Sequence, residues 1–157
     1  MAKLVYVAGP LFSRAEQAFL EEMVEALATA AGLDPVGDFF LPHRDAPEFN
    51  GVSWHNQVFH LEIQSVDAAT IVVALLDGHD VDSGASVELG YAYARNKKLF
   101  GLLTDFRAQL SPAGDVHRPN IMVWGVCEKG LSLYWDLPSL AGSFAQYVRH
   151  HLKESCS

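Results

Sequence analysis

The stretch Asp82-Ser83-Gly84-Ala85-Ser86-Val87-Glu88-Leu89-Gly90-Tyr91-Ala92, with the apolar run TIVVALL before it at residues 70–76, decides the fold. The apolar run has the length and the β-branched content of a strand that is buried on both faces. The quoted stretch predicts a helix with an apolar stripe, which begins after a capping side chain at Asp82 or Ser83. The sequence therefore predicts a strand, a turn and a helix in this order.

The turn between this strand and this helix, residues 77–82, is rich in carboxylates. In an open parallel sheet ligands bind outside the carboxyl ends of the strands, so we expect its three aspartates to converge with Glu88 at a crevice. A phosphate site would need a cation beside its glycines, and this turn has no Lys or Arg. Glu88 falls in the second helical turn, where the helix dipole modestly favours its ionised form. These features favour carboxylate chemistry, with Glu88 as a nucleophile.

Length, charge and cysteine content narrow the class of protein. The 157 residues, 50% of them hydrophobic, predict a single domain over residues 1–157. No apolar run is long enough to cross a membrane and no secretory cleavage site is seen, so we expect a cytoplasmic protein. Cys127 and Cys156 lack metal-binding spacing. The net charge of −8 opposes binding to a nucleic-acid polymer and favours a small neutral ligand.

Strand and helix patterns alternate along the whole chain. Expected strands are residues 4–8, 38–41, 69–76, 99–104 and 131–135, and expected helices are residues 14–31, 53–68, 83–96 and 137–153. A capping box at Ser13 and Glu16 begins the first helix, and Gly32 ends it. Residues 43–51 and 105–119 are expected to be loops, and the pattern at 120–126 fits either a short helix or a strand. This alternation predicts an α/β fold, a flavodoxin-like doubly wound sheet of about five parallel strands with helices on both faces.

Three motifs, read together, carry a resemblance to a known family. They are Asp82-x-Gly84-x-x-x-Glu88-Leu89-Gly90-Tyr91-Ala92, Tyr6-Val7-Ala8-Gly9-Pro10-Leu11-Phe12 and Asn120-Ile121-Met122-Val123-Trp124-Gly125. In this order they resemble the nucleoside 2-deoxyribosyltransferase family and span most of the chain. The resemblance implies nucleotide salvage by a transferase that exchanges the base of 2′-deoxyribonucleosides through a 2-deoxyribosyl ester on a glutamate. It implies retention at C1′ and no cofactor or metal.

The resemblance assigns catalytic roles to Glu88, Tyr6 and Glu62. Glu88 matches the nucleophile, since a carboxylate beneath the sugar can stabilise an oxocarbenium ion and then capture it. Tyr6 matches the tyrosine that orients this carboxylate. Glu62 stands where the family usually has an aspartate that protonates the leaving base. Ordinary roles remain open, because the same residues could be a dipole-favoured glutamate, a core tyrosine and a solvated glutamate.

The resemblance also places six residues around the substrate, namely Asp82, Gly9, Phe12, His43, Asn120 and Met122. Asp82 matches the aspartate that binds the 5′-hydroxyl of the sugar, although it could simply cap its helix. His43 stands where many relatives carry a glutamine that faces the base, although it could be merely exposed. Asn120 and Met122 match residues contributed to a neighbouring subunit's site, which implies a homo-oligomer, whereas Met122 in isolation reads as core.

Two other functions remain open. A hydrolase of 2′-deoxynucleoside 5′-monophosphates is disfavoured because the Asp82 carboxylate would repel a 5′-phosphate, but Arg44, Arg107 and Arg118 could approach it. A non-catalytic nucleotide-binding module is disfavoured because no glycine-rich phosphate loop is present. Water that competes for the ester would add a slow hydrolase activity. The expected partners are deoxynucleosides and free nucleobases, with no nucleic-acid polymer and no membrane.

Overall fold

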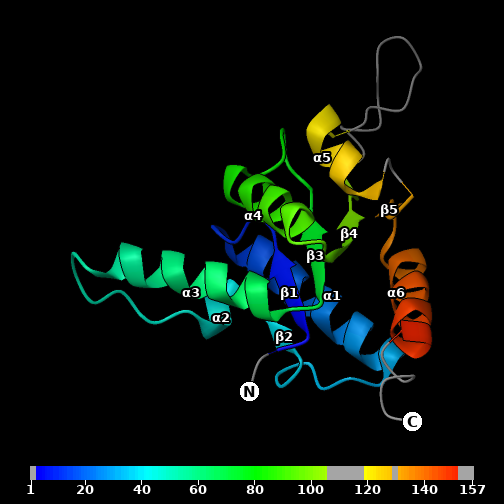
Figure 1. Cartoon of the computed structure of the whole chain (residues 1–157), viewed down its shortest axis with the longest axis horizontal. Helices are drawn as coiled ribbons and strands as arrows, with labels where there is room; N and C mark the ends of the chain where they lie inside the picture. The colour runs from blue at the N-terminus through cyan, green and yellow to red at the C-terminus, as the bar shows by residue number, and fades with distance from the viewer. Residues whose placement is uncertain (1–2, 106–118, 129–130, 152–157) are drawn as a thin grey trace.

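Five parallel strands form one sheet in the order β2-β1-β3-β4-β5 (Figure 1). The computed structural model describes residues 3–105, 119–128 and 131–151. The strands are β1 (Val5–Ala8), β2 (Phe39–Phe40), β3 (Ile71–Leu75), β4 (Lys98–Leu102) and β5 (Leu133–Tyr134). This strand order is that of flavodoxin-like doubly wound proteins, so the predicted fold class is confirmed.

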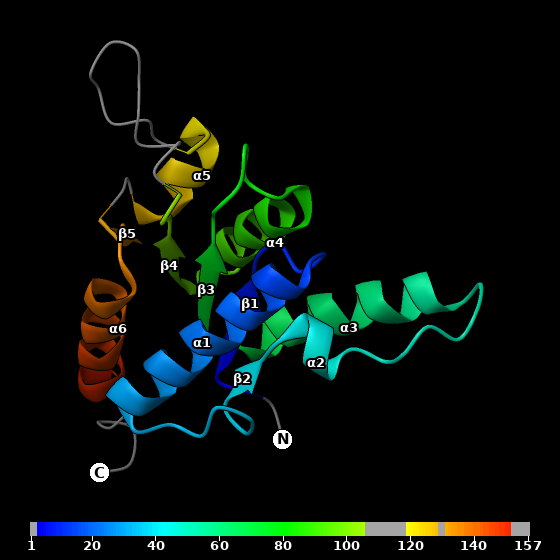
Figure 2. The same ribbon diagram turned by 180° about the vertical axis from the view of Figure 1, so that it is seen from behind.

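Helices cover both faces of the sheet. They are α1 (Arg14–Ala31), α2 (Pro42–Asp45), α3 (Trp54–Ala68), α4 (Ser83–Ala94), α5 (Ile121–Val126) and α6 (Leu137–His151). Helices α1 and α6 pack together over one face, while α3 and α4 lie over the other (Figures 1 and 2). Among the described residues no helix is both long and apolar enough to cross a bilayer.

The interior strand β1 shows how alternation divides the core. Val5 and Val7 pack into the cluster under α1 and α6, whereas Tyr6 and Ala8 pack into the cluster under α3 and α4. All four side chains are fully buried. Since successive side chains of a strand point to opposite faces, this register directs Tyr6 toward α4.

Local signals predicted the first helix correctly. The Ser13 hydroxyl accepts a hydrogen bond from the Glu16 amide at 3.2 Å, and the Ser13 amide donates to the Glu16 carboxylate at 2.7 Å. The helix ends at Gly32, whose φ of 70° is the left-handed conformation that glycine adopts without strain. The predicted capping box and stop signal are therefore confirmed.

Several predicted boundaries need correction. Residues 42–45, of which 43–45 were expected to be loop, form helix α2, because Asp45 accepts from the Leu41 amide and pairs with Lys3, both at 2.8 Å. The ambiguous segment is helix α5, whose first turn is capped by the Asn120 side chain. The strands expected at 38–41, 99–104 and 131–135 are shorter than predicted. Most of the expected loop at 105–119 and the end of the expected last helix lie outside the described residues.

Candidate active site

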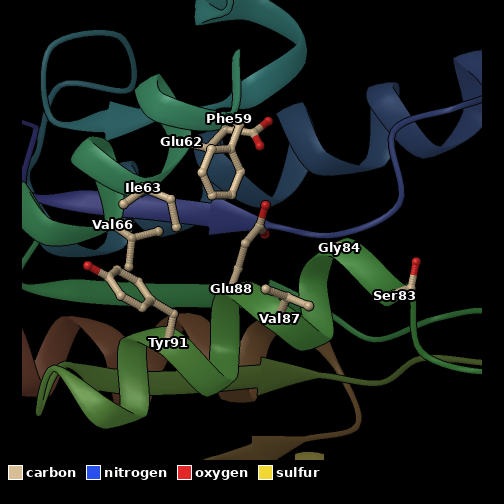
Figure 3. A pocket seen from close by; sticks show the side chains of 9 residues that line it. All are labelled: Phe59, Glu62, Ile63, Val66, Ser83, Gly84, Val87, Glu88 and Tyr91. Carbon is tan, nitrogen blue, oxygen red and sulfur yellow. The ribbon is translucent and has the colours of Figure 1, made fainter. Parts of the chain in front are cut away.

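A cleft of about 310 Å³ separates helices α3 and α4 (Figure 3). Its lining residues are Phe59, Glu62, Ile63 and Val66 from α3, and Ser83, Gly84, Val87, Glu88 and Tyr91 from α4. The four residues of α3 recur at the spacing of one helical face, which explains why they line one wall. The walls are mostly apolar, and two carboxylates, those of Glu62 and Glu88, lie within them. Small-molecule sites commonly combine an apolar lining with a few placed polar groups.

Tyr6 of β1, which does not itself line the cleft, holds the Glu88 carboxylate. The Tyr6 hydroxyl donates a hydrogen bond to Glu88 Oε1 at 2.9 Å. The Tyr6 ring is completely buried and stacks on Phe40, with ring centroids 5.4 Å apart and an interplanar angle of 12°. A fixed ring on the interior strand β1 allows the hydroxyl little freedom, so this bond restricts the carboxylate as well.

The environment of Glu88 does not favour its ionised form, contrary to the expectation from the helix dipole. The pKa of Glu88 is raised to about 7, and burial is the largest cause. The Tyr6 hydrogen bond acts in the opposite direction, while the nearby Glu62 and Asp82 carboxylates add to the rise. Desolvation of a carboxylate in an apolar cleft therefore outweighs the helix dipole. The side chain can accept and lose a proton near neutral pH.

Glu62 lies across the cleft from Glu88 and is half-buried, so its reading as a solvated helix face is wrong. Burial raises the pKa of Glu62 as well. Burial together with the two carboxylates also raises the pKa of Tyr6, so this hydroxyl stays protonated as a donor. Two carboxyl groups in one apolar cleft can divide the roles of proton donor and ionised partner.

The aspartates of residues 77–82 do not all converge on Glu88. Asp77 accepts hydrogen bonds from the Thr104 amide at 2.5 Å, from the Asp105 amide at 2.9 Å and from the Thr104 hydroxyl, so it joins the ends of β3 and β4. Asp82 Oδ1 accepts from the Ala85 amide at 2.9 Å, which confirms its reading as a helix cap. Asp82 alone among these aspartates acts on the pKa of Glu88.

Gly9, Phe12 and His43 lie outside the lining of the cleft. A Cβ atom at Gly9 would lie 3.0 Å from the Leu75 Cβ, so glycine permits the close passage of the chain from β1 over the end of β3. Phe12 is 78% exposed. The His43 ring is directed to α1, where its Nε2 lies 3.1 Å from Glu21 Oε1, so it is not simply exposed.

Asn120 and Met122 line a different cavity, of about 470 Å³, which lies between α4, α5 and residues 80–81. The Asn120 side chain accepts from the Met122 amide at 2.9 Å and so caps α5. Met122 is 73% exposed, so its reading as a core residue is wrong. Within one chain the structure thus brings together Glu88, Tyr6 and Glu62, with Asp82 near them, but neither Asn120 nor Met122.

Sequence reasoning missed most of the apolar walls. Phe59, Ile63 and Val66 share the helical face of Glu62, and that spacing was the signal that could have identified them. Tyr91 belongs to the quoted motif, and its hydroxyl donates to Asp67 Oδ2 at 3.0 Å. Among the described residues no group of three or more His, Cys, Asp or Glu side chains could hold a metal ion.

Solved structures with the same architecture place the chain among known proteins. A conserved protein from Enterococcus faecalis is 26% identical, with a TM-score of 0.76 over 93% of this chain and 99% of that one. A 2-deoxyribosyltransferase from Bacillus psychrosaccharolyticus is 21% identical, with a TM-score of 0.64 and coverage of 87% and 89%. A 2-deoxyribosyltransferase from Leishmania mexicana is 22% identical, with a TM-score of 0.61 and coverage of 95% and 99%.

The sequence comparison with protein families agrees with these structures. No curated protein matches the sequence. The family described as nucleoside 2-deoxyribosyltransferase matches residues 5–133, which include β1 with Tyr6, the cleft with Glu62 and Glu88, and helix α5. The chain therefore belongs to the nucleoside 2-deoxyribosyltransferase family.

Proposed function

We propose that the chain is a cytoplasmic salvage enzyme that moves 2-deoxyribose between nucleobases through a covalent ester on Glu88. The observation that supports this most is the pairing of Glu88, held by the Tyr6 hydroxyl, with Glu62 across one apolar cleft. Nucleoside 2-deoxyribosyltransferase-type activity follows from the family. The roles of individual residues, the ester and a slow side hydrolysis are parts of the proposal.

Two steps account for the exchange. In the first, the Glu62 carboxyl group donates its proton to a ring nitrogen of the base as the bond between C1′ and that base breaks. Tyr6 binds Glu88 Oε1, so Glu88 Oε2 bonds to C1′ and collapses the developing oxocarbenium charge into an ester. In the second, a new base attacks C1′ from the vacated face and returns a proton to Glu62, while the bond between C1′ and Glu88 Oε2 breaks and its electron pair returns to the Glu88 carboxylate. Two inversions give retention at C1′.

The acidity of the two carboxyl groups suits these roles. With a pKa of about 7, Glu88 is partly ionised at neutral pH, and the positive charge that develops on the sugar favours its ionised form. Burial raises the pKa of Glu62 as well, which favours its protonated form relative to an exposed glutamate. The reactive arrangement in this proposal is the one in which the proton lies on Glu62 and Glu88 is ionised.

We infer that the substrate is a deoxynucleoside with a free 5′-hydroxyl rather than a deoxynucleoside 5′-monophosphate. Asp82 is the proposed acceptor for the 5′-hydroxyl, and a phosphate there would face three carboxylates, those of Asp82, Glu62 and Glu88. Arg44 does not offset this charge, because its guanidinium already donates to the Phe39 and Pro35 carbonyl oxygens and to Asp45. Arg107 and Arg118 lie outside the described residues.

We further propose that each site is completed by a second copy of the chain. Asn120 and Met122 do not reach the Glu88 cleft of their own chain, and Met122 is largely exposed. Ile121 and Val87 are exposed apolar side chains on the neighbouring surfaces of α5 and α4. Burial of these side chains against a symmetry-related copy would explain why they are exposed in the single chain. It would also bring Asn120 to the sugar bound in the partner's cleft.

The direct test is to incubate the protein with one deoxynucleoside and a different free base, and to separate the products by chromatography. The proposed function predicts the exchanged nucleoside. Release of free base alone would indicate a hydrolase, and absence of any product would leave a binding module. Glu88→Gln should abolish exchange, whereas Glu25→Gln, the same change at an exposed position of α1, should keep it. Circular dichroism controls for the fold of both variants.

A further inference from the structure

The α3–α4 cleft continues past Glu88 in the direction away from the carboxyl ends of the strands (Figure 3). Ser83, Gly84 and Val87 lie on one side of the Glu88 side chain, toward those ends. Ile63, Val66 and Tyr91 lie on its other side, and the Phe59 ring lies above the Glu88 carboxylate. We call the end lined by Phe59, Ile63, Val66 and Tyr91 the apolar pocket.

The polar atoms of the apolar pocket are already engaged. The Tyr91 hydroxyl donates to Asp67 Oδ2 at 3.0 Å, and Arg95 Nε donates to Asp67 Oδ1 at 2.6 Å. This contact joins the last turns of α3 and α4 and turns the Tyr91 hydroxyl away from the cleft, so the ring faces inward. Val66 is fully buried, and Phe59 is 57% exposed. An occupant of this end gains from apolar contact and not from hydrogen bonds.

The apolar pocket adjoins the group that meets the leaving base in the proposed reaction. Ile63 follows Glu62 directly on α3, and Val66 lies one helical turn further on the same face. A base whose ring nitrogen is within reach of the Glu62 carboxyl group therefore has its adjacent edge beside Ile63. A substituent on that edge would extend toward Val66 and Tyr91.

From this continuity we propose that the apolar pocket selects nucleobases that carry an apolar substituent next to the ring nitrogen that Glu62 protonates. The inference rests on the proposed base exchange, since that reaction places the base at Glu62. It assigns a substrate class, deoxynucleosides of alkyl- or aryl-substituted bases, to a cleft whose volume of about 310 Å³ is typical of a small-molecule site. Removal of each methylene from water increases binding about fourfold, which corresponds to about 0.8 kcal/mol.

A substituent series tests the inference on the wild-type chain. The series is purine 2′-deoxyribonucleosides with hydrogen, methyl, ethyl or propyl at carbon 6, which is bonded to N1 and is separated from N7 by carbon 5, and 6-hydroxymethyl as a polar control. We expect kcat/KM for exchange to rise about fourfold with each added carbon. The hydroxymethyl compound should fall below the ethyl compound, because its hydroxyl would lose water without gaining a partner. A flat or falling series would overturn the inference.

Binding separates this inference from the proposed function. Calorimetric titration of Glu88→Gln with the same compounds measures their affinity for the apolar pocket in a variant that is expected to carry out no reaction. Absence of exchange together with a rising affinity series would contradict the transferase and support the apolar pocket. Exchange together with flat rates and flat affinities would support the transferase and overturn the apolar pocket. The same flat series is expected if side chains of a second copy fill this end of the cleft.

Two variants test the residues themselves. Ile63→Phe fills the apolar pocket, so we expect the ratio of propyl to unsubstituted kcat/KM to fall below one. The matched control is Val58→Phe, at a half-buried position of α3 outside the cleft lining, which should keep the wild-type ratio. Phe59→Ala is a second variant at a mostly exposed site. Because it removes one wall of the apolar pocket, the rise of kcat/KM with substituent length should become smaller. Wild-type ratios in both Ile63→Phe and Phe59→Ala would overturn the assignment.

Discussion

Replacement of Tyr6 by Phe tests how the site controls the acidity of Glu88. The ring is kept, so its stacking on Phe40 and its burial persist, while the hydrogen bond of 2.9 Å to Glu88 Oε1 is lost. A hydrogen bond to a charged acceptor contributes about 1.5–3 kcal/mol, which is about one to two pKa units. The Tyr6 hydroxyl lowers the pKa of Glu88 from what burial alone would give, so its removal raises that pKa further above 7.

The assay is the pH dependence of kcat/KM with a nitrophenyl-type 2-deoxyriboside, whose leaving group needs no proton from Glu62. At pH 7 we expect Tyr6→Phe to be about 5- to 50-fold slower than wild type, because a smaller fraction of Glu88 is ionised. The rate should approach the wild-type rate about two pH units higher. A carbon-13 NMR titration of labelled glutamate side chains, assigned with Glu88→Gln, reads the same shift directly. An unchanged midpoint, or a loss of rate that persists at high pH, would refute this role of Tyr6.

Three further predictions concern the carboxylates and the subunit arrangement. The pKa of Glu88 rises from 4.5 to about 7 on folding, so the stability of the wild-type chain falls as pH rises through this interval. Glu88→Gln lacks this titration and should therefore be more stable than wild type above about pH 7. Urea unfolding should show a difference that grows with pH up to about 3 kcal/mol, and a constant difference would contradict the shift. Glu62→Ala should slow poor leaving groups far more than a nitrophenyl group, whereas equal losses would indicate only positioning. Co-refolded Glu88→Ala and Asn120→Ala chains should regain about a quarter of the parental activity, and no recovery in proven mixed oligomers would exclude a shared site.

Signals that act within a few residues predicted much of the fold. The capping box at Ser13 and the glycine at residue 32 fixed the ends of α1, because their partners lie in the same helix. Apolar runs at residues 4–8 and 69–76 predicted the two central strands, because burial on both faces leaves no polar alternation. Together with the central helix these elements were sufficient for the fold class.

Features that depend on distant partners could not be predicted in this way. Helix α2 has a polar sequence, and the Asp45 carboxylate that supports it is paired with Lys3, 42 residues earlier. The six residues of α5 are too few for periodicity to decide, and its exposed Ile121 and Met122 obscure any amphipathic pattern.

The candidate site shows the same limit. The motif with Glu88 was recognisable, but the raised pKa of this carboxyl group depends on burial against α3, which no local pattern shows. The link between Asp77 and residues 104–105 likewise joins two strand ends that are 27 residues apart. Tyr6 was matched to the nucleophile only through the family resemblance, and its contact with Glu88 spans 82 residues of sequence.

Covalent trapping is the most direct test of the proposed ester on Glu88. The protein is incubated with a 2-fluoro-2-deoxy sugar nucleoside, quenched in acid, digested and analysed by mass spectrometry. The expected result is one added glycosyl mass on the peptide that contains Glu88, with fragmentation that locates it at this residue and no adduct in Glu88→Gln. Exchange of deoxynucleosides by a protein that forms no such adduct, or an adduct on another residue, would contradict Glu88 as the nucleophile.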